Sequence, residues 1–66
     1  MSEQAVSPLL VSVERAAELL GVGRTLVYEM LRAGSLPSIA LGRRRLVPVK
    51  GLEAFVEQLT RAQAAV

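Results

Sequence analysis

The sequence predicts a mainly α-helical domain of three helices with one small β-hairpin, all within 66 residues. Three observations lead to this prediction. Apolar residues recur at helical spacing in three separate stretches, glycines stand at the ends of the first two stretches, and a short alternating segment turns at a glycine before the third. A chain of this length forms one domain at most. Its hydrophobic content of 52% indicates that it folds around a core.

The first helix is predicted at residues 13–20. Ser12 offers a hydroxyl cap for its amino end, and Glu14 lies in the first turn, where the helix dipole favours a negative charge. Gly21 ends the helix. Residues 1–8 are expected to form a disordered tail, residues 9–64 the domain, and residues 9–11 an apolar lead-in. The helix's apolar stripe is expected to face the core and consists of Val13, Ala16, Ala17 and Leu20.

The second helix is predicted at residues 24–33. It follows Gly23, which can cap a helix without offering a side-chain acceptor, and it stops at Gly34. At about 100° per residue, its apolar and polar residues fall on opposite sides. The apolar side is expected to be core and holds Leu26, Val27, Met30 and Leu31. The polar side presents Arg24, Thr25, Tyr28, Glu29 and Arg32.

The predicted hairpin follows a loop at residues 35–38. Residues 39–41 alternate like a strand, Gly42 and the next two arginines form a turn, and residues 45–49 return. Because an isolated two-stranded hairpin is marginally stable, we expect it to pack on the helices. The third helix is predicted at about residues 50–64, with a core stripe of Leu52, Phe55, Val56 and Leu59.

The composition excludes several classes of function. The chain contains no cysteine, histidine, aspartate or asparagine. This inventory excludes disulfides, thiolate or histidine zinc sites, and a Ser-His-Asp triad, so we expect no enzyme, no metal and no cofactor. No apolar run of about 18 residues is present, and the first residues do not read as a signal peptide. A cytoplasmic protein without a membrane partner is therefore expected.

The basic charge is concentrated in the middle of the chain. Residues 23–50 hold six basic residues against Glu29 alone, a net charge of +5. The residues before this segment sum to −2, and those after it sum to −1. Charge separated in this way indicates that one face of the domain is directed at a polyanion.

Two helices joined by a short glycine-containing turn match a helix-turn-helix, whose second helix enters the DNA major groove. The candidate groove-facing residues are Arg24, Thr25, Tyr28 and Arg32. Arginine can donate two hydrogen bonds to guanine, the threonine methyl can meet a thymine methyl, and the tyrosine can contact a phosphate or the sugar edge. On its own, such a face is more typical of an ordinary solvated helix than of a DNA-reading one.

The residues of the predicted hairpin turn favour DNA binding over an ordinary solvated surface. Arg43, Arg44 and Arg45 place three like charges within about 10 Å, an arrangement whose repulsion a polyanion relieves. The alternative is that these arginines serve solubility. For Glu29 we expect a salt bridge with Arg24 or Arg32 in preference to a contact with a cytosine amino group. For Lys50, a phosphate contact and a plain surface position both stay open.

Residues 12–59 resemble the excisionase-type branch of the MerR-like winged helix-turn-helix family. The resemblance is carried by SVERAAELLGVGRTLVYEMLRAGSLP, then IALGRRRLVP, then LEAFVEQL. It implies a recombination directionality factor or a small phage or plasmid regulator that binds short tandem sites, bends DNA and contacts an integrase or further copies of itself. The sequence departs from the family pattern at Gly23, Thr25, Leu26, Glu29 and Leu46.

The predicted function is therefore sequence-specific binding of double-stranded DNA by a recognition helix and a basic wing, in an excisionase of a mobile element. Two alternatives stay open at this point. One is a small transcriptional regulator of the same fold, and the other is an adaptor that presents its basic segment to an acidic protein.

Overall fold

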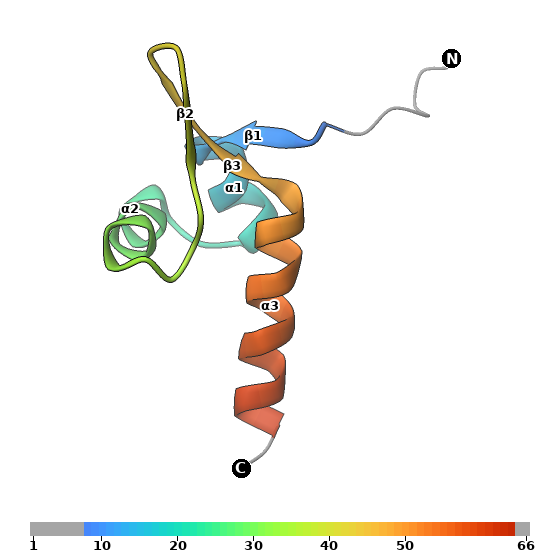
Figure 1. Ribbon diagram of the computed structural model, residues 1–66. Coiled ribbons are helices and arrows are strands. Elements are labelled where there is room, and N and C mark those ends of the chain that lie inside the picture. The colour runs from blue at the N-terminus through green and yellow to red at the C-terminus, as the bar shows by residue number, and fades with distance from the viewer. Residues whose placement is uncertain (1–7, 65–66) are drawn as a thin grey trace.

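The computed structural model describes residues 8–64, which form three helices and a three-stranded antiparallel sheet (Figure 1). The predicted fold class, three helices with a small β-hairpin, is confirmed. The first two helices have the predicted bounds, and the third begins one residue earlier than expected. The tail predicted for residues 1–8 lies outside the described residues except for Pro8. In chain order the elements are β1 (Leu10–Ser12), α1 (Val13–Leu20), α2 (Arg24–Ala33), β2 (Ile39–Leu41), β3 (Arg44–Pro48) and α3 (Val49–Ala64).

Local capping explains the bounds of α1 and α2. The Ser12 Oγ accepts a hydrogen bond from the Arg15 N–H at 3.0 Å, which satisfies one of the free donors of the first turn of α1. Gly21 and Gly34 end the two helices with φ values of 78° and 80°, a left-handed conformation that other residues rarely adopt. At the start of α2, Gly23 makes no side-chain cap.

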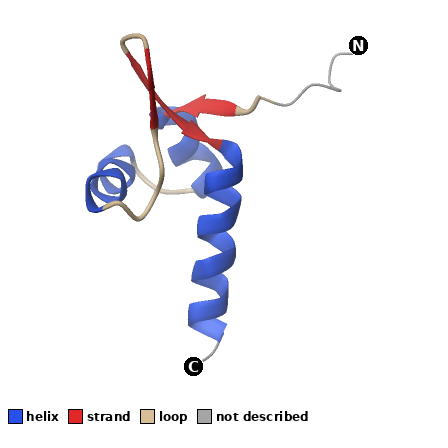
Figure 2. Ribbon diagram, viewed as in Figure 1, coloured by secondary structure: helices blue, strands red, loops and turns tan. Residues whose placement is uncertain are grey.

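The sheet contains a strand that the sequence did not reveal. The segment expected to be an apolar lead-in forms β1, which pairs with β3 so that Val11 lies opposite Val47. The strand order is β1-β3-β2, with the central strand shared between the hairpin and β1. The Val49 N–H also donates to the Leu9 carbonyl at 2.9 Å. The hairpin is therefore anchored through β3 and projects beyond the helices (Figure 2).

The core is small and lies where the sheet meets the helices. Leu36, from the loop after α2, belongs to it although no periodicity marks this residue. Leu20, Met30, Leu31, Val49 and Phe55 pack against the core while staying partly exposed. The buried set consists of Val11, Val13, Ala16, Ala17, Val27, Leu36, Val47 and Leu52.

Three residues expected in the core are exposed, which corrects the sequence prediction. Val56 and Leu59 are 46% and 45% exposed, because α3 runs on beyond the rest of the domain and only its first turns meet the other elements (Figure 1). Leu26 is 46% exposed. It stands about 100° from the buried Val27 around α2, at the edge of the side that the small domain can cover.

A close approach fixes the loop between α2 and β2. At Gly51, in the first turn of α3, an added Cβ would lie 2.6 Å from the Cγ of Pro37 and 3.3 Å from that of Pro48. Any side chain there would displace one of these rings. The absence of a side chain at this position lets the loop of residues 35–38 lie against α3.

Candidate nucleic-acid interface

The polar side of α2 is exposed, as its spacing predicts. Val27, on the opposite side of the helix, is completely buried and holds α2 against the domain. Tyr28 keeps 45% of its surface exposed. All four residues predicted to face DNA from this helix are exposed: Arg24, Thr25, Tyr28 and Arg32.

Arg24 has a partner that differs from the predicted one. Its Nη1 lies 3.3 Å from the Glu14 Oε2 of α1, and both side chains are more than half exposed. In the part of the chain that the structure describes, Glu29 forms no ion pair, so the expected bridge from Glu29 to Arg24 or Arg32 is wrong. Arg24 stands at the end of α2 next to the turn, where α1 is within its reach. An exposed pair of this kind contributes little stability, so Arg24 can exchange Glu14 for another acceptor at low cost.

The wing ends in a tight turn of two residues. Leu41 pairs with Arg44, so Gly42 and Arg43 form the turn between the strands. Gly42 has a φ of 63°, which matches the type II′ turn that requires glycine at its first central position. Arg43 and Arg44 are therefore at the exposed tip of the hairpin. Between residues 8 and 64, no ion pair joins a wing arginine to a glutamate.

Strand alternation separates the third arginine from these two. Arg45 shares a face of β3 with the buried Val47, whereas Arg44 and Leu46 lie on the other face. The Arg45 Nη1 donates a hydrogen bond of 2.7 Å to the Oγ of Ser38. Ser38 is a site residue that sequence reasoning missed, because a lone serine in a loop has no pattern that connects it with an arginine seven positions later.

One small cleft brings the helix and the wing together. It is lined by Tyr28, Leu31 and Arg32 from α2 and by Arg45 from β3. Two residues predicted from the helix and one predicted from the wing therefore share a single concave surface, and α2 and the hairpin lie on the same side of the molecule (Figure 1). Arg24 and Thr25, at the amino end of α2, do not line it.

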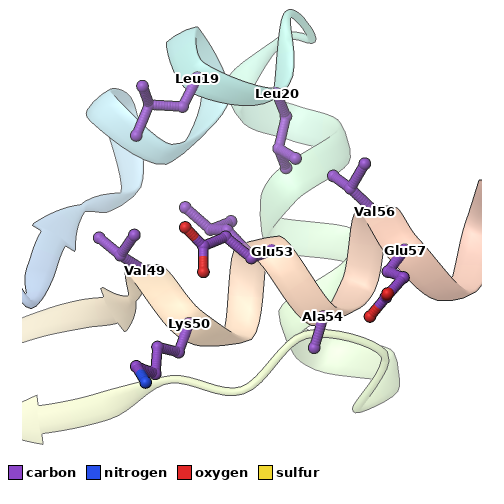
Figure 3. A pocket seen from close by; sticks show the side chains of 9 residues that line it. Leu19, Leu20, Val49, Lys50, Glu53, Ala54, Val56 and Glu57 are labelled. Carbon is purple, nitrogen blue, oxygen red and sulfur yellow. The ribbon is translucent and has the colours of Figure 1, made fainter.

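A second depression, an apolar groove, lies between α1 and α3 (Figure 3). Leu20 of α1 points across it toward Val56, whereas Leu19 lies nearer the end of α3 that holds Val49. It shares no residue with the cleft between α2 and the wing. Lys50, for which a phosphate contact was left open, is among the residues that line this groove. The groove residues are Leu19, Leu20, Val49, Lys50, Leu52, Glu53, Ala54, Val56 and Glu57.

Comparison with known proteins agrees with this architecture. Residues 10–60 match the model of a family described as "Helix-turn-helix domain". The chain belongs to this helix-turn-helix family. Helix-turn-helix domains typically bind double-stranded DNA through their second helix, so this match supports DNA binding as the general function. Over the residues described, no helix combines the length and the apolar character needed to cross a membrane.

The chain is also similar to a protein named "Probable excisionase" from Saccharopolyspora erythraea. The two are 35% identical over 57 residues, which cover 86% of this chain and 58% of the relative. The chain thus spans less than two thirds of the length of that relative. The similarity agrees with the excisionase-type resemblance in the sequence, whereas the placement in a MerR-like branch stays a prediction.

Proposed function

We propose that this helix-turn-helix protein binds a specific double-stranded DNA site as an excisionase, a directionality factor for the recombination of a mobile element. The observation that carries the DNA-binding part is the cleft in which Tyr28, Arg32 and Arg45 meet, because it joins the second helix and the wing into one basic surface. The similarity to a protein named a probable excisionase supports the choice of excision over other DNA-dependent functions.

In this proposal α2 lies in the major groove. Recognition helices contact base edges mainly through their amino-terminal residues, which are Arg24 and Thr25 in this helix. Arg24 would release Glu14 and donate two hydrogen bonds to a guanine, and Thr25 would meet a neighbouring base edge. Arg43 and Arg44 at the tip of the wing would neutralise backbone phosphates beside the groove.

The partners proposed are duplex DNA, further copies of the protein on adjacent sites, and a recombinase. A single short helix reads few base pairs, so tandem copies would add both affinity and specificity. No cofactor is required for this function, because binding and bending of DNA use only side-chain contacts.

The proposal is tested by selecting bound duplexes from a random pool and footprinting the protein on the selected site. Enrichment of one short motif, protected in one or more tandem copies, supports specific binding. If a recombinase is encoded beside this gene, excision in a reconstituted reaction with that recombinase supports the finer role. Failure to bind mixed-sequence duplex even at low salt, together with capture of an acidic protein, would favour the adaptor alternative instead.

A further inference from the structure

The cleft between α2 and the wing has the chemistry of an anion site. Its lining contains two guanidinium groups, from Arg32 and Arg45, and one phenol, from Tyr28. No carboxylate lines it, and within residues 8–64 neither arginine forms an ion pair with a glutamate. Two like charges that share a small concavity repel each other, and a bound anion removes that repulsion.

We infer that this cleft binds one phosphate of the DNA backbone and that Ser38 positions Arg45 for it. The inference rests on the proposed DNA binding and adds to it a defined subsite. Guanidinium groups bind phosphate oxygens through paired, charge-assisted hydrogen bonds, and the tyrosine hydroxyl can donate a third bond. Leu31 supplies the apolar part of the lining.

Ser38 orients Arg45 without neutralising it. The hydrogen bond of 2.7 Å from Nη1 to Oγ occupies one of the five N–H donors of the guanidinium and leaves the others for a ligand. A hydroxyl acceptor carries no charge, so the full positive charge of Arg45 stays available. The contact of Gly51 with Pro37 holds the loop just before Ser38, which makes this orientation a property of the fold.

The subsite gives the two ends of α2 different roles in DNA binding. Arg24 and Thr25, outside the cleft, keep the role of base readers, whereas Tyr28 and Arg32 become backbone contacts. Phosphate contacts fix the position and orientation of a protein on the duplex without carrying sequence information themselves. A phosphate held between helix and wing would therefore set how deeply α2 enters the major groove.

The test uses the full chain and its selected duplex, in which one phosphate at a time is replaced by an uncharged methylphosphonate. For the unaltered protein, we expect one position where neutralisation weakens binding about tenfold or more. At that position the Arg45→Ala and Arg32→Ala variants should each show a much smaller loss than the unaltered protein, because one of the two guanidinium groups that bind the phosphate is already missing. Arg43→Ala, which removes an equal charge outside the cleft, should keep the full sensitivity.

Ser38 is tested as a positioning residue by two substitutions. Ser38→Ala should weaken binding severalfold and reduce the methylphosphonate effect at the same single position. Ser38→Thr keeps the hydroxyl and should restore both. Melting curves by circular dichroism identify any variant that fails to fold. For Arg45, the Arg45→Gln variant also removes the charge and provides a second measurement of the methylphosphonate effect.

The outcomes separate the inference from the proposed function. Specific binding by the unaltered protein without any phosphate coupled to Arg45 overturns the phosphate subsite and leaves DNA binding intact. Equal sensitivity of Arg45→Ala and Arg43→Ala at every position overturns it in the same way. Absence of duplex binding by the unaltered protein overturns the proposed function itself.

Discussion

Removal of the two arginines at the wing tip should flatten the salt dependence of DNA binding. The candidate interface carries five arginines at least partly open to solvent: Arg24, Arg32, Arg43, Arg44 and Arg45. If each of these positive charges releases about one condensed counterion from the duplex, whether it contacts a base or shares a phosphate, the logarithm of the binding constant falls with the logarithm of salt concentration at a slope of about −4.5. Arg43→Ala/Arg44→Ala leaves three such charges and a slope of about −2.7.

The difference is large enough to measure by fluorescence anisotropy with a labelled duplex. Between about 50 and 200 mM salt, affinity should fall about 500-fold for the unaltered protein and about 40-fold for the double variant. The matched control is Arg15→Ala/Arg61→Ala. It removes the same net charge from two exposed side chains that pair with glutamates on α1 and α3, and it should keep the original slope.

Two results would refute this reasoning. If the control flattens the slope as much as the wing variant does, the slope reports overall charge rather than contacts made by the wing. If the wing variant keeps the original slope, the hairpin tip does not touch DNA. In either case the assignment of the wing to the backbone is lost.

Three further predictions concern single residues. Arg24→Ala should cost about 1–3 kcal/mol of binding free energy and relax specificity at one base pair, as measured by titrating duplexes in which that pair is changed. An equal loss of affinity on every sequence would indicate that Arg24 contacts the DNA backbone instead. Gly51→Ala should lower the melting temperature, because the added Cβ would lie 2.6 Å from the Cγ of Pro37. This is expected although alanine stabilises a helix interior by about 1 kcal/mol relative to glycine. A raised melting temperature would show that the proline ring moves aside. Gly23→Ser should stabilise the fold by a few tenths of a kcal/mol, since Gly23 has an extended conformation with open space where a Cβ would be added. An equal gain from Gly23→Ala would exclude capping as the cause.

The parts of the fold that sequence predicts well are those determined locally. Ser12, Gly21 and Gly34 set the ends of α1 and α2 through hydrogen bonds and backbone conformations within a few residues. Strand β1 has three residues and exists only because β3 pairs with it, so no local pattern marks it. Periodicity shows that Val56 and Leu59 share a face of α3 but not whether another element covers that face.

The candidate site likewise has a part that local sequence predicts and a part that depends on strand pairing. The exposed side of α2 follows from helical spacing and one buried residue, Val27. The separation of Arg45 from Arg44 depends on the pairing of Leu41 with Arg44, and a shift of one residue would exchange their faces. The bond from Arg45 to Ser38 follows from that pairing. Sequence therefore indicates which residues are available, and the register of the hairpin decides which of them meet.

The central claim is that the polar side of α2 and the wing contact DNA together. Amide chemical-shift mapping of the isotope-labelled protein with its selected duplex tests it most directly. The account predicts large shifts in residues 24–33 and 38–46 at the same protein-to-duplex ratio, with small shifts from Val56 to Ala64 in α3. Shifts concentrated in the groove between α1 and α3, with the wing unchanged, would contradict it.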